Sequence, residues 1–531
     1  MKNPVNLGLA RRTILAGISG SFIASASSAV GEEEKPIERV TWALREAVRT
    51  LDPSFANVTH NTVHSLGYEG LLEFAPDGSL VGKLAESWSQ PDPLTYIYRV
   101  RDGVTFWDGS PLTADDVAFS LNRVRDPATK SGWASFYAAV ESITPTGPRE
   151  VTAKLKQPDP LFRRIPAFGG ARIHSRKAAE AAGPQFGTTA QSTMGTGPYR
   201  FTGFRPADSI TVERYAGYWG EKPAVQQAQI NCIVDEATRF LAMRTGQIDG
   251  TFTIPLDQAE QWQGLAGVSS GFAPALVTFM IMLDTTVAPY DDVHVRHAIA
   301  YALDRVALTK SVLQGHAQPA VMLPTPEQWA GLLGTSEVKA LYGSVNPYAF
   351  NLDRAREELA KSSVPKGFRA AAIYPDSRQQ NGLALQSLSQ NLKQIGITLD
   401  VKEVPLAQWL NANLQHTGDG LKVSSWAATS ADAAEMPGTF FDSRFAVPGA
   451  FNAANYKNPD IDKLLQAQRS SLDQHERGKI LGEIVKIAAE DVAYIPVWHE
   501  DIGYAIKSRY RYRDFSVWHR WQNWLGRIAV A

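Results

Sequence analysis

Residues 68–127 read YEGLLEFAPDGSLVGKLAESWSQPDPLTYIYRVRDGVTFWDGSPLTADDVAFSLNRVRDP, and this stretch decides the fold. Apolar and polar residues nearly alternate over 96–106, which predicts two half-buried strands. Residues 101–103 predict the turn between them, because glycine readily takes a positive φ. Thr113 is expected to cap a helix whose first turn carries two aspartates. Nothing here indicates catalysis, so we interpret the stretch as a rigid scaffold.

Length and composition limit the class of protein. A chain of 531 residues exceeds what one hydrophobic core usually serves, so two or three lobes are expected. Hydrophobic residues make up 44% and charged residues 20%, which is typical of a globular protein. The 53 basic and 54 acidic residues form no basic stripe, so no nucleic-acid partner is expected. Cys232 is the single cysteine, which excludes an internal disulfide and a cysteine-cluster metal site.

Residues 1–29 are expected to form a signal peptide. Arg11 and Arg12 precede an apolar stretch that is rich in small residues, as in exported bacterial proteins. The two arginines also fit a twin-arginine (Tat) signal, but such pairs occur in Sec signals too, so both routes stay open. No cysteine stands directly after the apolar stretch, so we expect a protein that diffuses freely in the periplasm, without a lipid anchor.

Short sequence blocks outside residues 68–127 belong to the same recognisable pattern as that stretch. The blocks are 51–53 (LDP), 195–199 (GTGPY), 246–249 (GQID), 288–298 (APYDDVHVRHA), 302–305 (ALDR), 395–397 (IGI) and 456–462 (YKNPDID). Together with 68–127, they resemble the family 5 extracellular solute-binding proteins, the dipeptide- and oligopeptide-binding components of bacterial ABC importers. The chain departs from the family pattern at Trp107, where a histidine is usual.

The resemblance implies an α/β fold, a two-lobed periplasmic-binding-protein clamp of the cluster C type with an extra subdomain on the first lobe. The mixture of helical and strand patterns along the chain favours the same class. Pro-containing stretches at 274–283 and 494–498 are predicted to cross between the lobes, which places the ligand in the cleft. The expected units are 36–66, 191–277 and 499–531 for lobe I, 67–190 for its subdomain and 278–498 for lobe II.

No catalytic, cofactor or metal motif stands out. The glycines at 195–197 are followed by Pro198, so they cannot open the helix that a dinucleotide fold requires. His294 and His297 lie three apart on a predicted helix, a spacing that two metal ligands could share. The motif offers no third ligand, so we interpret both as surface or structural histidines. We therefore expect no enzyme activity, no cofactor and no metal.

Trp426 is the best guide to the pocket, because the resemblance places it at the mouth of the cleft. In peptide binders an aspartate three residues later pairs with the α-ammonium of the ligand, and a buried cation without a counter-charge is costly. Here Thr429 occupies that position, and Asp432 lies where the family often has a second acid that supports the loop. The ammonium anchor is therefore expected to be missing or displaced.

The remaining candidate ligand residues are positions that the resemblance places at the cleft. They are Asn57, Thr59, Trp133, Met282, Tyr374 and Arg378. Oligopeptide binders often carry a tyrosine where this chain has Trp133 and an acid near Met282. The expected pocket is aromatic and methionine-containing with few charges, although Trp133 and Met282 could instead belong to the core.

These features predict the periplasmic substrate-binding component of an ABC-type importer, acting as a monomer with an inner-membrane permease and its ATPase. The small-molecule ligand is expected to be sugar-, opine- or modified-peptide-like rather than a plain dipeptide. One alternative is a di- or oligopeptide binder whose ammonium is held by Asp432 or another acid. An alternative of another class is a secreted hydrolase on the same scaffold.

Overall fold

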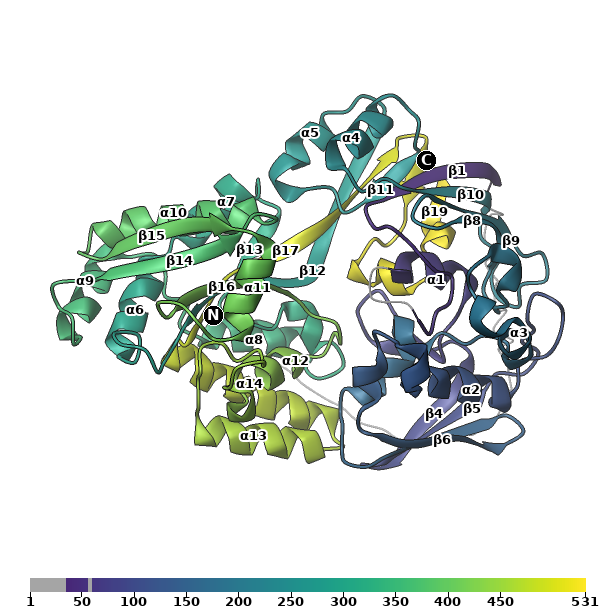
Figure 1. Cartoon of the computed structure of the whole chain (residues 1–531), viewed down its shortest axis with the longest axis horizontal. Coiled ribbons are helices and arrows are strands. Elements are labelled where there is room, and N and C mark those ends of the chain that lie inside the picture. The colour runs from purple at the N-terminus through teal and green to yellow at the C-terminus, as the bar shows by residue number, and fades with distance from the viewer. Residues whose placement is uncertain (1–34, 56–59) are drawn as a thin grey trace, which may run out of the picture.

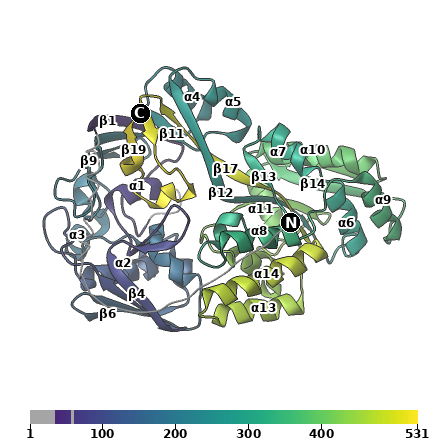
Figure 2. The same ribbon diagram turned by 180° about the vertical axis from the view of Figure 1, so that it is seen from behind.

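The computed structural model describes residues 35–55 and 60–531, which form two lobes joined by two long strands (Figure 1). Asn57 and Thr59, like the expected signal peptide, lie outside the described residues. Seen from behind, the same two strands again connect the lobes (Figure 2). No helix of the described part of the chain is both long and apolar enough to cross a membrane.

One nine-stranded sheet runs through both lobes. Its main order is β16 (Leu421–Ala427), β12 (Val268–Leu283), β17 (Tyr494–Lys507), β11 (Gly250–Phe252), β1 (Ile37–Leu44), β10 (Val225–Cys232), β9 (Ser209–Arg214) and β8 (Tyr199–Arg205). The short strand β13 (Ala317–Pro319) pairs with β17 off this path. The two crossings expected from the sequence are therefore the C-terminal part of β12 and the N-terminal part of β17.

β12 is almost wholly apolar at its C-terminal end because both of its faces are buried. Phe279, Ile281 and Leu283 point into the core of the second lobe. Met280 and Met282 belong to a different hydrophobic cluster, which continues into the subdomain of the first lobe. Alternating residues of one strand thus serve two cores, as the period of two in a strand requires.

The first lobe is built on one half of the large sheet, which contains strands β11, β1, β10, β9 and β8. Its core contains Trp42, Phe252 and Trp524, whose rings lie 4.7 to 5.1 Å apart. The smaller elements of this lobe are α1 (Asn61–Gly67), α4 (Glu236–Arg244), α5 (Ala259–Gln263), β18 (Tyr510–Tyr512) and β19 (Ile528–Val530), whereas α3 (Arg176–Ala182) packs against α2 (Ala114–Arg125) of the subdomain. The C-terminal tail therefore returns to the lobe in which the described chain begins.

The subdomain contains the stretch that opened the sequence analysis. Its four-stranded antiparallel sheet has the order β4 (Ala85–Asp92), β5 (Thr95–Val100), β7 (Glu150–Leu155) and β6 (Val140–Gly147). A two-stranded ribbon, β2 (Leu72–Phe74) and β3 (Leu80–Gly82), precedes it. Thr113 caps α2 (Ala114–Arg125) in a reciprocal capping box with Asp116, so the expected helix start is confirmed.

The second strand expected within 96–106 does not form. Only an isolated bridge between Thr105 and Pro111 occurs after β5. The backbone of residues 104–112 instead hydrogen-bonds to itself, from Phe106 N to Ser110 O and from Leu112 N to Val104 O. This tight turn buries Val104 and Phe106 without a neighbouring strand, so alternation alone was misleading.

The second lobe surrounds a parallel pair, β14 (Arg369–Pro375) and β15 (Thr398–Val404), and the β16 edge of the large sheet. Its helices are α6 (Val293–Tyr301), α7 (Arg305–Val312), α8 (Thr335–Ser344), α9 (Leu352–Lys361), α10 (Gln379–Lys393), α11 (Leu406–Leu414), α12 (Glu435–Phe440), α13 (Pro459–Ser470) and α14 (Gln474–Asp491). The predicted helix that carries His294 and His297 is α6, which ends at Tyr301, and Asp304 caps the next helix.

Glu69 ties the subdomain to the first lobe. Its buried carboxylate accepts hydrogen bonds from Thr196 Oγ1 (2.9 Å), Tyr218 Oη (2.7 Å) and Trp219 Nε1 (2.9 Å). Lys83 Nζ supplies the counter-charge at 3.5 Å. Removing the carboxylate would leave four buried or half-buried donors without this acceptor.

Glu69→Ala should therefore lower the free energy of unfolding by about 3 kcal/mol, the scale of a broken buried ion pair. Glu73→Ala is the matched control, because Glu73 contacts the same lysine at 3.6 Å but is more exposed. It should cost less than about 1 kcal/mol. Denaturant unfolding of both variants measures the difference, and equal losses would show that Glu69 has no special structural role.

Candidate functional site

A cavity of about 340 Å³ lies between the subdomain and the second lobe. Ser135, Asp159 and Leu161 line it from the subdomain, and Glu435 and Thr439 line it from the second lobe. The hydrophobic cluster that contains Met280 and Met282 adjoins both sides of this region. The cavity therefore lies between two parts of the chain that belong to different lobes, and its lining residue Glu435 hydrogen-bonds to the loop that follows Trp426.

Strand β16 positions Trp426, which pairs with Thr278 of β12. The half-buried indole lies edge-on to Phe440 and Phe451, with ring centroids 5.2 and 5.1 Å away. Its Nε1 donates to Glu435 Oε1 over 3.3 Å. The ring is thus held in place by aromatic edges and one hydrogen bond, while part of it stays accessible.

The carboxylate of Glu435 lies beside Thr429, the position where the family's peptide binders carry an aspartate. The backbone N–H of Thr429 donates to both carboxylate oxygens, over 2.9 and 3.0 Å, and the Thr429 hydroxyl donates over 3.2 Å. The backbone N–H and hydroxyl of Ser430 donate to Glu435 Oε2 as well. The only sequence signal was an acid in the first turn of a short helix, so this residue was missed.

These contacts leave Glu435 little capacity for a ligand. Five donors, including Trp426 Nε1, share one carboxylate that has about four lone-pair sites. The carboxylate therefore orders the loop of residues 426–430. All five donors belong to neutral groups, so they occupy its lone pairs without supplying a counter-charge.

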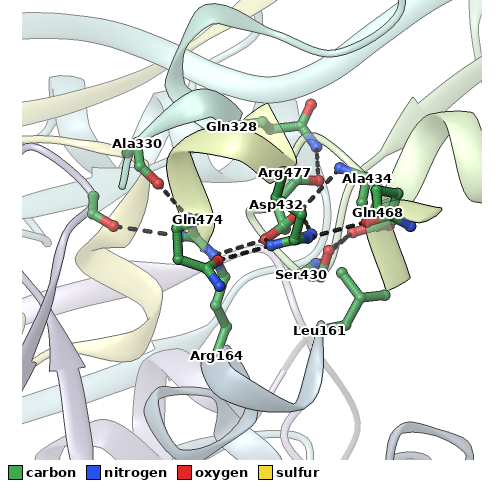
Figure 3. A network of polar contacts seen from close by, with 12 residues as sticks. Leu161, Arg164, Gln328, Ala330, Ser430, Asp432, Ala434, Gln468, Gln474 and Arg477 are labelled. Atoms are coloured by element: carbon green, nitrogen blue, oxygen red, sulfur yellow. Dashed lines mark hydrogen bonds and ion pairs between the residues drawn. The ribbon is translucent and has the colours of Figure 1, made fainter. Parts of the chain in front are cut away.

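Asp432 lies in a buried network with two arginines (Figure 3). Arg477 donates to its Oδ1 over 2.7 Å and to its Oδ2 over 3.2 Å, and Arg164 Nε donates to Oδ2 over 3.3 Å. Burial alone would raise the pKa of Asp432, but the two guanidinium groups hold that pKa below its usual value. Asp432 is therefore ionised and already paired on both oxygens.

The network joins the two lobes. Arg164 lies in the subdomain, in a 3₁₀ helix (Phe162–Ala167), whereas Asp432 and Arg477 belong to the second lobe. Arg164 also donates to the backbone oxygen of Ala330, another second-lobe residue. Gln468 and Gln474 accept from Arg477, so this guanidinium is fixed from several sides (Figure 3).

Trp133 and Met282 are both almost wholly buried, at 2% exposure each. Trp133 packs against Gly170, and its ring lies 5.5 Å from that of Phe136. Within the described part of the chain, its indole N–H has no hydrogen-bond partner. Their contact with a ligand stays a prediction.

Tyr374 and Arg378 lie together at the end of β14, but each has a protein partner. The Tyr374 hydroxyl donates to Glu403 Oε2 over 3.0 Å. Arg378 Nη1 donates to Glu500 of β17 over 3.4 Å, and about a third of the arginine side chain is exposed. Arg378 is thus the more accessible of the two side chains, and its protein partner belongs to the crossing strand β17.

A hydroxyl–imidazole pair occurs at the crossing strands but is not arranged for catalysis. Thr278 Oγ1 lies 2.9 Å from His499 Nδ1, and the same hydroxyl donates to Leu323 O over 2.8 Å. Its single proton is therefore used, so His499 must be the donor and cannot act as a base toward Thr278. Burial lowers the pKa of His499 to about 3 and keeps the ring neutral.

Known proteins with similar sequences and folds are solute-binding proteins. The glutathione-binding protein GsiB of Escherichia coli K12 is 27% identical over 491 residues, which cover 91% of this chain and 92% of GsiB. Periplasmic binding protein DppA from Helicobacter pylori, solved with the peptide STSA, has a TM-score of 0.72 at 22% identity, covering 93% and 98% of the chains. MoaA from A. tumefaciens R10, solved with mannopinic acid, has a TM-score of 0.69 at 22% identity, covering 93% and 99%.

The structural matches confirm the expected two-lobed α/β fold. The model of the bacterial extracellular solute-binding proteins, family 5 (middle region), matches residues 79–446. This match covers more than half of the sequence. The chain is therefore a member of the family 5 bacterial extracellular solute-binding proteins.

Proposed function

We propose that this chain is the periplasmic substrate-binding component of an ABC importer, and that it captures its solute between the lobes without an ammonium anchor at position 429. The observation that carries the proposal is the Thr429–Glu435 contact, which fills the anchor position with a saturated carboxylate. A membrane permease and its ATPase would receive the solute, and the chain itself would do no covalent chemistry.

The charges around the loop of residues 426–432 favour a ligand without a free α-ammonium. A buried ammonium needs a counter-charge, because desolvating it costs several kcal/mol. Thr429 carries no charge, Asp432 is paired with two arginines, and the lone pairs of Glu435 are already occupied by five neutral donors. Sugar-, opine- or N-modified peptide-like solutes satisfy these limits, and the half-buried Trp426 offers such ligands an aromatic surface.

Asp159 supports the alternative, a peptide binder with a displaced anchor. Its carboxylate lines the interlobe cavity, and none of the ion pairs among the described residues includes it. Burial raises its pKa, although backbone hydrogen bonds and the charge of Arg477 act in the opposite direction. An ammonium group bound in this cavity would find its counter-charge there.

Isothermal titration calorimetry with unmodified dipeptides, N-acetylated dipeptides, sugars and opines distinguishes a ligand without a free α-ammonium from a peptide held by a displaced anchor. We expect the unmodified dipeptides to bind at least about tenfold more weakly than the best neutral or N-modified compound, which corresponds to ~1.4 kcal/mol. Micromolar binding of several plain dipeptides, lost in Asp159→Asn, would instead establish the displaced anchor.

The Arg164–Asp432 contact connects the ligand proposal to clamp closure. Ligand can bind both lobes only when they approach, so binding shifts the clamp toward the closed state. Arg164 reaches Asp432 and Ala330 across the lobes in this structure. We therefore propose that it stabilises the closed form.

Arg164→Ala should enlarge the radius of gyration measured by small-angle X-ray scattering and lower stability by about 1–3 kcal/mol, because buried acceptors lose their donor. Arg163→Ala is the control, since none of the ion pairs in the described residues includes this neighbouring arginine. It should change neither quantity. An unaltered radius and melting temperature in Arg164→Ala would refute the role in closure.

A further inference from the structure

His294, His297 and Glu358 lie together on the surface of the second lobe. The two histidines are one turn apart on α6, and Glu358 is on α9. His294 Nδ1 is 2.7 Å from Glu358 Oε2, and His297 Nδ1 is 3.6 Å from the same oxygen. One possible ligand atom from each residue lies within 4.8 Å of the others. We infer that these three side chains form a binding site for a divalent transition-metal ion.

Two of the three distances between ligand atoms suit such an ion with little rearrangement, and the distance between the two histidines must close to the same range from at most 4.8 Å. Zinc bonds of about 2.0–2.2 Å at tetrahedral angles separate neighbouring ligand atoms by roughly 3.3 Å. The contact of His297 with Glu358 is close to this value, and that of His294 needs to lengthen by about half an ångström. Two imidazoles and a carboxylate are ligands that zinc, nickel and copper accept.

The hydrogen bond on the far side of His297 prepares its ring for a metal. His297 Nε2 lies 2.9 Å from the backbone oxygen of Glu490, which can only accept, so Nε2 carries the proton. When Nδ1 carries no proton, it directs a lone pair toward a carboxylate oxygen, and two acceptors face each other. A cation between them satisfies both, as in metal sites where the second histidine nitrogen donates to a carbonyl.

Glu358 is ready to act as an anionic ligand. Its Oε2 lies 2.7 Å from His294 Nδ1, which donates the proton of this hydrogen bond, so a metal ion bound between the two atoms would take the place of that proton. Lys361 Nζ contacts the other oxygen, Oε1, over 2.8 Å and its side chain is half-exposed. The lysine therefore competes with the ion electrostatically without occupying the oxygen that faces both histidines.

The site lies apart from the interlobe cavity. α6 and α9 are at the end of the second lobe that faces away from the first lobe in both views (Figures 1 and 2). A bound ion would link these two helices and, through His297 and Glu490, the C-terminal end of α14. We therefore assign it a stabilising role within the second lobe, and this inference does not depend on the proposed ligand.

Zinc titration of untagged, chelator-treated protein by calorimetry tests the site. Wild-type protein should bind one Zn²⁺ through these residues, with a raised melting temperature in zinc. His294→Ala, His297→Ala and Glu358→Gln should each weaken binding at least about tenfold, since even outer-shell partners matter by about 10–100-fold. Lys361→Ala should strengthen binding, a direction that misfolding cannot produce.

His475→Ala is the matched control. His475 Nε2 lies 2.7 Å from Glu337 Oε1, an exposed histidine–glutamate pair outside the three-residue cluster. Zinc affinity should be unchanged in this variant. The inference is overturned if wild-type protein binds no zinc, if the cluster variants keep full affinity, or if His475→Ala loses it.

Discussion

The antiparallel pairing of β12 with β17 is the contact on which the placement of both lobes depends. The two strands pair from Val268–Lys507 in the first lobe to Met282–Tyr494 in the second. Their register shifts between Pro274 and Thr278, where three residues of β12 lie opposite a single residue of β17. Such an irregularity increases local bending and twist. The strands thus connect the lobes at the place where a clamp must bend.

Buried charge is distributed unequally around this connection. The Arg164–Asp432–Arg477 network joins the lobes, whereas Glu435 accepts hydrogen bonds from the loop after Trp426. Buried ion pairs contribute little net stability because desolvation offsets their attraction, but losing one partner is costly. The network therefore specifies which surfaces meet more than it strengthens the fold. The network also occupies Asp432, whereas the two cavity-lining acids, Asp159 and Glu435, take part in no ion pair among the described residues.

Local sequence signals predicted the local features well. The strand at 96–100, the Thr113 cap and the two crossings could be read from alternation, capping chemistry and proline positions. The strand expected at 104–106 failed because the backbone forms a tight turn there, which alternation cannot distinguish.

The site was less predictable because its charges are set by distant partners. Thr429 could be identified from the family resemblance, but the role of Asp432 depends on Arg164, 268 residues away. Glu358 likewise reaches His294 from 64 residues along the chain. Neither pairing leaves a pattern in the sequence, since tertiary packing alone brings these side chains together.

The central claim is that the clamp holds a small solute lacking a free α-ammonium. Native mass spectrometry of protein purified from the periplasm without refolding, with fragmentation of any bound species, tests it most directly. The account predicts one defined bound mass per protein, whose fragments show a sugar-, opine- or N-modified compound. A series of masses from unmodified short peptides would contradict it.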